Sequence, residues 1–298
     1  SSLQVLRTAE AETRITEHAT LSGLTRSGGL IRDIEQTGTY IEAVRNESIS
    51  GLADMIDAAE KRDGTGLLRN LGMRIFDLDN PAMTADVIRE VFRNADGHTG
   101  NKAAIAGARA WLDVIEAMRQ RFNAAGGSIG KLGYGYLSQA HDAVRVQKAG
   151  ADGWARKVLP MLDREQYVRS DGSLMNDGEV LDLLRGAWET ISTNGDNKVA
   201  PGQFKGTGAR ANRGGEHRVL HFRDGEAWMG YMDEFGEGSL YDAMVGHVGA
   251  MARDIGLVER YGPNPEQLFR VQKDIAERAD GRGTTANRRG RRQRRRAR

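Results

Sequence analysis

The sequence predicts an all-α protein: an irregular bundle of several helices, joined by long polar loops and followed by a disordered basic tail. Three observations predict this class. Apolar residues recur at steps of three and four along most of the chain, which is the spacing of one face of a helix. Glycine-rich polar segments interrupt that pattern. The last residues have almost no apolar side chains and cannot bury a core.

Length and composition limit the number of domains and the kinds of site that the chain can hold. A chain of 298 residues can hold one or two domains. It has no cysteine, which excludes disulfides and thiolate metal sites and suits a reducing compartment, or a virion assembled in one. It has no run of 18 apolar residues, so we expect no membrane span. The first residues have no signal-peptide layout and no starting Met, and we expect a processed chain or a fragment of a longer protein.

The charge is divided unevenly along the chain. The net charge of +2 includes nine arginines and no acidic residue in the last 18 residues, from Gly281 onward. Without them the chain has 34 basic and 41 acidic residues, a balance of −7. We therefore predict an acidic body and a separate basic tail, residues 281–298.

The N-terminal region, residues 1–127, is predicted to be helical. Residues 1–60 have the pattern of two amphipathic helices that bury their leucine and isoleucine stripes against each other, with a break at Ser27-Gly28-Gly29. Further helices are expected at residues 67–76, at residues 85–93 after a Thr84 cap, and at residues 101–122.

Residues 128–140, SIGKLGYGYLSQA, are glycine-rich and aromatic. They lack the Gly-Lys-Ser/Thr ending of a phosphate-binding loop, and no strand precedes them. We predict an ordered loop in which the tyrosines pack and the glycines allow close approach. It marks the start of a C-terminal helical module, residues 128–280.

Several helices are predicted in this module. They cover residues 141–149, residues 152–162, a stretch from a cap at Asn176 or Asp177 to Thr190, residues 225–235 after Asp224, Ser239–Tyr261, and residues 266–279. The last of these helices is predicted to bury Leu268, Phe269, Val271 and Ile275. Residues 191–204 resemble a calcium loop but keep only one carboxylate, Asp196, and lack the required glycine and final Glu, so a polar loop is expected.

The helix at Ser239–Tyr261 contains Gly246, Gly249 and Gly256 beside an apolar stripe of near-heptad spacing. Each glycine costs roughly 1 kcal/mol relative to alanine in a helix. We therefore expect all three to allow close packing against a neighbouring helix.

Histidines are the other polar candidates. His247 and Asp254 are seven residues apart on one helical face and are predicted to form a structural polar pair. The alternative is a metal-dependent phosphoesterase or nuclease using His141, Asp142, His217, His221 and His247. It requires at least three of these groups to converge. The spacing nominates no catalytic residue, metal ligand set or cofactor, and a non-enzymatic protein is favoured.

Three groups of residues carry a resemblance. They are residues 121–127 (RFNAAGG) with His141-Asp142, residues 211–213 (ANR) with His217-Arg218, and the run from Phe222 through residues 251–255 (MARDI) to residues 262–265 (GPNP). Together they resemble the large internal virion, or ejection-type, proteins of tailed bacteriophages and prophages, over roughly residues 100–272. The resemblance implies a virion protein packed with the genome and released into the host at infection. It transfers no catalytic residue, and such proteins are often much longer.

The tail is similar to arginine-rich nucleic-acid peptides, which bind phosphates without reading sequence. The predicted nucleic-acid-binding residues are Arg288, Arg289, Arg291, Arg292, Arg294, Arg295, Arg296 and Arg298. The alternatives are binding to an anionic partner surface, or a solvated terminus or tag remnant.

These expectations combine into one hypothesis: a phage internal virion protein, or a fragment of one, whose tail binds packaged DNA or another nucleic acid. It would reside in the virion interior, and in the host cytoplasm during assembly. Other virion proteins and a second copy of the chain are the further expected partners. A helical adaptor for a capsid or portal surface is a third reading.

Overall fold

The computed structural model describes residues 2–63, 81–193 and 219–296, and the side chains of residues 53, 55–63 and 282–296 are not described. Within those ranges the chain forms α-helices and short 3-10 turns, and it forms no β-strand. Only isolated antiparallel bridges occur there, such as Leu162 with Phe222. The predicted all-α class is confirmed.

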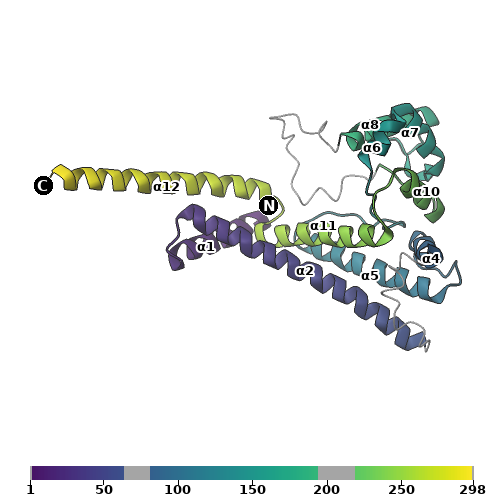
Figure 1. Ribbon diagram of the computed structural model, residues 1–298, viewed down its shortest axis with the longest axis horizontal. Coiled ribbons are helices and arrows are strands. Elements are labelled where there is room, and N and C mark those ends of the chain that lie inside the picture. The colour runs from purple at the N-terminus through teal and green to yellow at the C-terminus, as the bar shows by residue number, and fades with distance from the viewer. Residues whose placement is uncertain (1, 64–80, 194–218, 297–298) are drawn as a thin grey trace.

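The helices follow one another in the order shown in Figure 1. They are α1 (Ser2–Leu21), α2 (Arg26–Asp63), α4 (Pro81–Phe92), α5 (Lys102–Ala124), α6 (Ala143–Ala149), α7 (Ala151–Val158), α8 (Asp177–Ser192), α10 (Gly225–Phe235), α11 (Leu240–Tyr261) and α12 (Pro265–Arg296), with 3-10 turns η1 (Leu159–Met161) and η2 (Arg164–Gln166).

The helices are arranged around α11. Helices α2 and α5 pack against α11, and α4 packs on α5. Helices α6, α7, α8 and α10 gather at one end of the molecule, while α1, the start of α2, and α12 lie at the other, where α12 extends outward (Figure 1). The main core contains residues from both sides of residue 127, including Trp111 and Tyr231. The division into two helical regions remains a prediction.

Side-chain caps explain where several helices begin. Asn101, Asp142, Asn176, Asp224 and Ser239 each accept a hydrogen bond from a backbone N–H in the first turn of the following helix. Such caps satisfy donors that have no partner inside the helix. The predicted starts at Asp224 and Ser239 are confirmed, and of the two candidates at 176–177 the cap is Asn176.

Two predicted helix starts are wrong. Helix α2 begins at Arg26, so the expected break at Ser27-Gly28-Gly29 is its first turn. A Cβ on Gly29 would lie 2.4 Å from the Ile15 carbonyl oxygen, so this glycine lets α1 and α2 pack closely. Helix α4 begins at Pro81, not after Thr84, because proline fits the first helical turn.

The glycines of α11 differ from one another. A Cβ on Gly256 would lie 2.6 Å from Cγ1 of Ile41 on α2, as close packing requires. At Gly246 and Gly249 an added Cβ would meet nothing within 4 Å. The expectation of close packing is therefore confirmed for Gly256 and wrong for the other two, where no other element comes close enough to touch an added side chain.

Some predicted core residues are exposed. On α2, Ile31 and Ile34 are 58% and 45% exposed, and on α12, Val271 and Ile275 are 47% and 38% exposed. The prediction that they are buried is wrong, because α12 buries a different stripe, which includes Gln272, and α2 turns Asp33 and Thr37 inward.

The C-terminal prediction is corrected too. The tail was expected to be disordered from Gly281, whereas α12 continues as one helix to Arg296. No proline follows Pro265, and arginine is a good helix former. The predicted helix at 67–76 and most of the 191–204 loop lie outside the described residues. In the part of the chain that is described, no helix is long and apolar enough to cross a membrane.

Candidate functional site

The arginine-rich segment belongs to α12, which is held at Asp280 by the first turn of α2. The Asp280 carboxylate accepts hydrogen bonds from the backbone N–H groups of Arg26 at 3.2 Å and Ser27 at 3.3 Å. These are the first two residues of α2, where a carboxylate both caps the helix and complements its dipole. The hydrogen bonds from Ser27 lower the pKa of Asp280.

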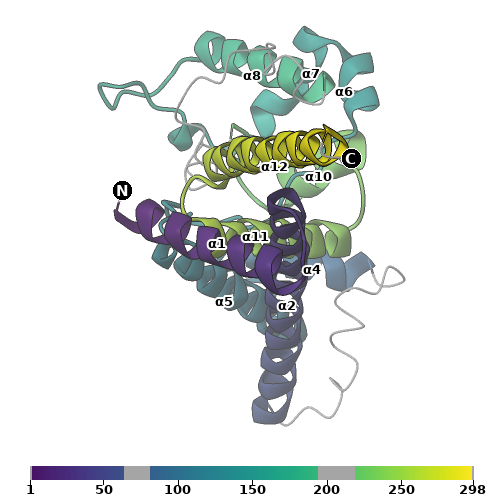
Figure 2. The same cartoon turned by 90° about the vertical axis from the view of Figure 1, so that its left-hand side faces the viewer.

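The attachment of α12 continues inward from Asp280. The Arg26 guanidinium donates to Oε1 of the buried Gln272 at 2.9 Å. Leu268 and Ala276 are buried on the same helix. Beyond Asp280 no acidic residue remains in the sequence, and α12 leaves the body (Figures 1 and 2). The predicted phosphate-binding arginines from Arg288 to Arg296 are therefore part of a helix that projects from the body, and Arg298 lies outside the described residues.

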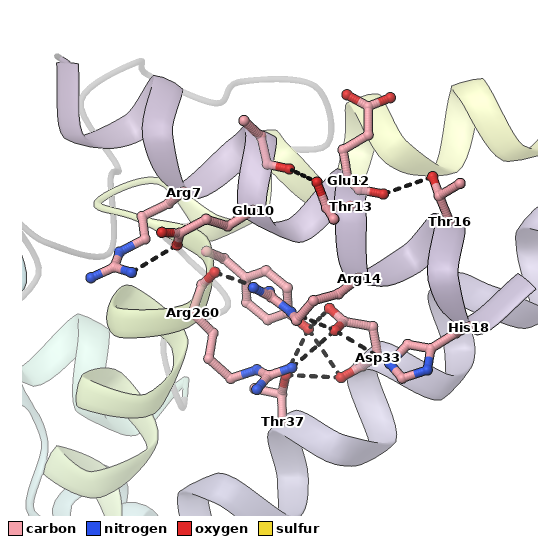
Figure 3. Close-up of polar contacts among 12 residues, drawn as sticks. Arg7, Glu10, Glu12, Thr13, Arg14, Thr16, His18, Asp33, Thr37 and Arg260 are labelled. Atoms are coloured by element: carbon pink, nitrogen blue, oxygen red, sulfur yellow. Dashed lines mark hydrogen bonds and ion pairs between the residues drawn. The ribbon is translucent and has the colours of Figure 1, made fainter. Parts of the chain in front are cut away.

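A buried carboxylate holds the helices beneath this attachment together. Asp33 of α2 is completely buried. Its Oδ1 accepts hydrogen bonds from Arg14 Nε of α1 at 2.8 Å and from Arg260 Nη2 of α11 at 2.9 Å (Figure 3). Its Oδ2 accepts one from the Tyr261 hydroxyl at 2.8 Å. One side chain thus bridges three helices.

The surrounding groups complete this network. The Thr37 hydroxyl donates to the Asp33 carbonyl oxygen and lies 2.7 Å from the Tyr261 hydroxyl. Burial raises the pKa of Tyr261 to about 12, so its hydroxyl stays protonated and can donate. His18 Nε2 lies 4.0 Å from Asp33 Oδ1. These bonds tie α1, α2 and α11 together, and the network acts as a structural clamp.

Sequence reasoning missed Asp33. The sequence did contain a signal. One face of α2 contains Leu30, Asp33, Thr37 and Val44, so an acidic residue lies among apolar or small side chains on that face. A carboxylate in that position must be paired to be buried. The two arginines that pair with it are far away in sequence, and periodicity cannot identify them.

The His141 ring has a hydrogen-bond partner within the core. Its Nδ1 lies 2.8 Å from the Tyr231 hydroxyl, and the two rings meet edge to face with centroids 5.7 Å apart. Burial lowers the pKa of His141 to about 4, so the imidazole is neutral near pH 7. Its neighbour Asp142 points elsewhere and caps α6 through the N–H groups of Val144 and Arg145.

The other histidines have separate environments. The His221 ring packs against Tyr167 with centroids 5.9 Å apart, and the His247 ring against Trp111 at 6.0 Å. His217 lies outside the described residues. Among the residues that are described, no three His, Asp or Glu side chains converge as a metal site would require. The described members of the metal-site alternative, which are His141, Asp142, His221 and His247, therefore do not converge.

His247 and Asp254 are both half-buried on α11. Seven residues along a helix correspond to a rise of about 10 Å, so the two side chains lie two turns apart. Their role as a structural polar pair remains a prediction.

The glycine-rich loop at 128–140 lines two hollows. A cavity of about 160 Å³ lies between Tyr134, Gln166 and His221, and a wider groove of about 710 Å³ borders Arg109 and Lys131. Gly135 is buried, has φ +70°, and lies against Phe92. The expected close approach is confirmed at this glycine. Residues 128–140 form a loop, as expected.

The acidic group beside the smaller cavity is already engaged. Tyr134 donates its hydroxyl proton to Asp163, and Gln166 donates to the same carboxylate oxygen at 3.2 Å. Burial acts to raise the pKa of Asp163, but these hydrogen bonds hold that pKa below its ordinary value. Burial and Asp163 raise the pKa of Tyr134. A low-pKa carboxylate bound to a high-pKa phenol is a stable pair and a poor general base.

Comparisons with protein-family models, with curated proteins and with solved structures found no match to this chain.

Proposed function

We propose that this chain is a non-enzymatic virion protein, or part of one, that binds packaged nucleic acid through its C-terminal arginines. The observation that carries the proposal is the charge of the segment after Asp280: it has nine arginines and no acidic residue, and eight of these arginines belong to α12. A dense cationic segment neutralises phosphates and releases their counterions whatever the base sequence.

Two further features support the proposal. Helix α12 projects from the body (Figure 1), so a duplex can approach its basic end without meeting the acidic body. The virion assignment depends on the resemblance of residues 100–272 to internal virion proteins of tailed phages. The metal-dependent alternative receives no support from the described histidines.

DNA binding is tested by removing residues 282–298. The full chain should bind duplexes of unrelated sequence with similar affinity and with steep salt dependence, and the shortened chain should lose that binding. Fluorescence anisotropy with two labelled duplexes of equal length measures both effects. Equal binding by the shortened chain contradicts the role given to the tail.

A matched pair of variants separates charge from side-chain shape. Replacing the eight arginines at 288–298 by lysine keeps the charge, and affinity should change only a few-fold. Replacing the same residues by glutamine removes the charge and should act like the truncation. If lysine fails as glutamine does, recognition depends on the planar guanidinium and not on phosphate charge.

The virion role is tested by mass spectrometry of purified particles from the source of the sequence. The protein should be present in filled particles and depleted in particles that have released their genome. Detection only in the particle-free fraction of infected cells contradicts the proposal.

A further inference from the structure

The arginine-rich part of α12 leads away from the rest of the protein. Helix α12 packs on α2 and α11, and Ala276 is its last buried residue among those whose side chains are described. A Cβ added to Gly281 would meet nothing within 4 Å. Residues 282–296 continue the helix and project from the body (Figures 1 and 2). A partner can therefore approach this segment from more than one side.

Arginines occupy most of the circumference of this segment. Of the nine residues 288–296, seven are arginine. At about 100° per residue, these seven positions span an arc of about 220° around the helix axis. The remaining arc, about 140° wide, contains Gly290 and Gln293 with Ala286 from the preceding turn. Arg282 also lies in this second arc, next to the attachment point. Positive charge is thus not confined to one stripe of the helix.

A charge arc of this width fits a partner that encloses the helix. A helix that lies on a flat surface uses a stripe of roughly 100°, so about half of the arginines would have no anion there. Arginines three or four residues apart, such as Arg288 and Arg292, also repel each other in an isolated helix. Phosphates on two sides of the helix pair with the unused arginines and remove this repulsion. The arc therefore favours a groove over a flat anionic surface.

The major groove of B-form DNA has the required dimensions. It is about 12 Å wide, whereas the minor groove is about 6 Å wide. An α-helix with its side chains is about 10–12 Å across, so it fits the major groove and not the minor one. Residues 282–296 rise by about 21 Å along the helix axis. A helix of this length inside the groove has one phosphate backbone on each side.

We propose that residues 282–296 bind as a helix in the major groove of duplex DNA. The arginine arc meets the two phosphate backbones, and the arc of Ala286, Gly290 and Gln293 faces solvent. This inference rests on the proposed function and adds to it the form of the nucleic acid and the mode of binding. Because phosphate contacts carry no sequence information, any duplex sequence is accepted. A single strand has no groove and attracts the same arginines by charge alone.

The test changes helix formation and keeps the charge. Gly290→Pro breaks the helix, because proline lacks the N–H and clashes with the preceding turn, whereas Gly290→Ala favours the helix. Both full-length variants keep all nine arginines, and the position lies beyond the attachment to the body, so their melting temperatures should be equal. The proline variant should bind a duplex about tenfold more weakly than the alanine variant. Fluorescence anisotropy measures both affinities, and on a single strand of equal length they should be alike.

Chemical probing of the wild-type complex shows which groove is occupied. Dimethyl sulfate methylates guanine N7, which lies in the major groove, and adenine N3, which lies in the minor groove. The bound chain should protect N7 and leave N3 reactive. Equal duplex binding by the two variants overturns the groove proposal and leaves binding by charge intact, as does unprotected N7 on a saturated duplex. A wild-type chain that binds no duplex overturns the proposed function itself.

Discussion

At the residue scale, Asp33 shows how a buried charge can specify the arrangement of helices. Its carboxylate is fully buried and its two arginine partners are one-fifth to one-quarter exposed. Such a network contributes little net stability compared with apolar packing, but breaking it is costly. Its value here is specificity, because this placement of α1 and α11 on α2 brings to the carboxylate the partners that it needs.

Substituting Asp33 by alanine should therefore destabilise the protein strongly. Removing one partner of a buried pair costs about 3–5 kcal/mol, and we expect a value near 3 kcal/mol because both arginines can turn partly to water. Urea unfolding measures the change. Glu35→Ala, at an exposed position on the same helix, should change stability by less than about 0.5 kcal/mol. Equal effects of the two substitutions would refute the clamp role.

His141 makes a second residue-scale prediction, which concerns pH. Its folded pKa of about 4 is below the ordinary value of about 6.5, so the unfolded chain binds a proton more readily than the folded chain. Stability is then complete above pH 6.5 and falls as the pH drops toward 4. Between pH 7 and pH 5 the protonation of this histidine should lower the free energy of unfolding by about 2 kcal/mol.

The measurement compares urea unfolding of the wild-type protein and of His141→Gln at pH 7 and pH 5. The glutamine variant should lose less stability between the two values, because it has no group to protonate at that position. If both proteins lose the same amount, the pH dependence arises from other groups.

At the scale of elements, glycines within one helix have opposite consequences. Gly246→Ala should stabilise the protein by about 1 kcal/mol, because alanine is the better helix former and the added methyl meets open space. Gly256→Ala should destabilise it by about 1–3 kcal/mol, since the methyl overlaps Ile41. The melting temperature of each variant, compared with that of the wild-type protein, shows whether the substitution stabilises or destabilises the fold. The same sign in both would show that packing against α2 does not decide the difference.

The same contrast shows what sequence can and cannot predict. Helix starts at Asp224 and Ser239 were predictable, because a capping side chain acts within one turn. The direction in which Ile31, Ile34 and Val271 face was not, because the apolar period is compatible with more than one stripe when helices pack pairwise. The histidines were named as possible partners, but only the fold shows that His141 belongs to Tyr231 and His247 to Trp111.

At the scale of the whole molecule, charge separates the chain into two parts of opposite sign. The body has a balance of −7, and the segment after Gly281 has nine positive charges. An acidic body is repelled by phosphate, so binding by the whole chain should depend almost entirely on the number of arginines retained in α12.

A series of shortened chains tests this dependence. The slope of log K against log salt is about −0.9 for each phosphate neutralised on duplex DNA. The full chain, with nine arginines, should therefore approach a slope of about −8. A chain ending at Gly290 keeps only Arg282, Arg288 and Arg289 and should have a slope of about −3. A chain ending at Gly281 should bind too weakly to measure. Salt titrations followed by fluorescence anisotropy give these slopes. Each arginine that is removed leaves one more counterion on the DNA, so the slope should become shallower as the chain is shortened. A slope that does not change with length would assign the phosphate contacts to the body.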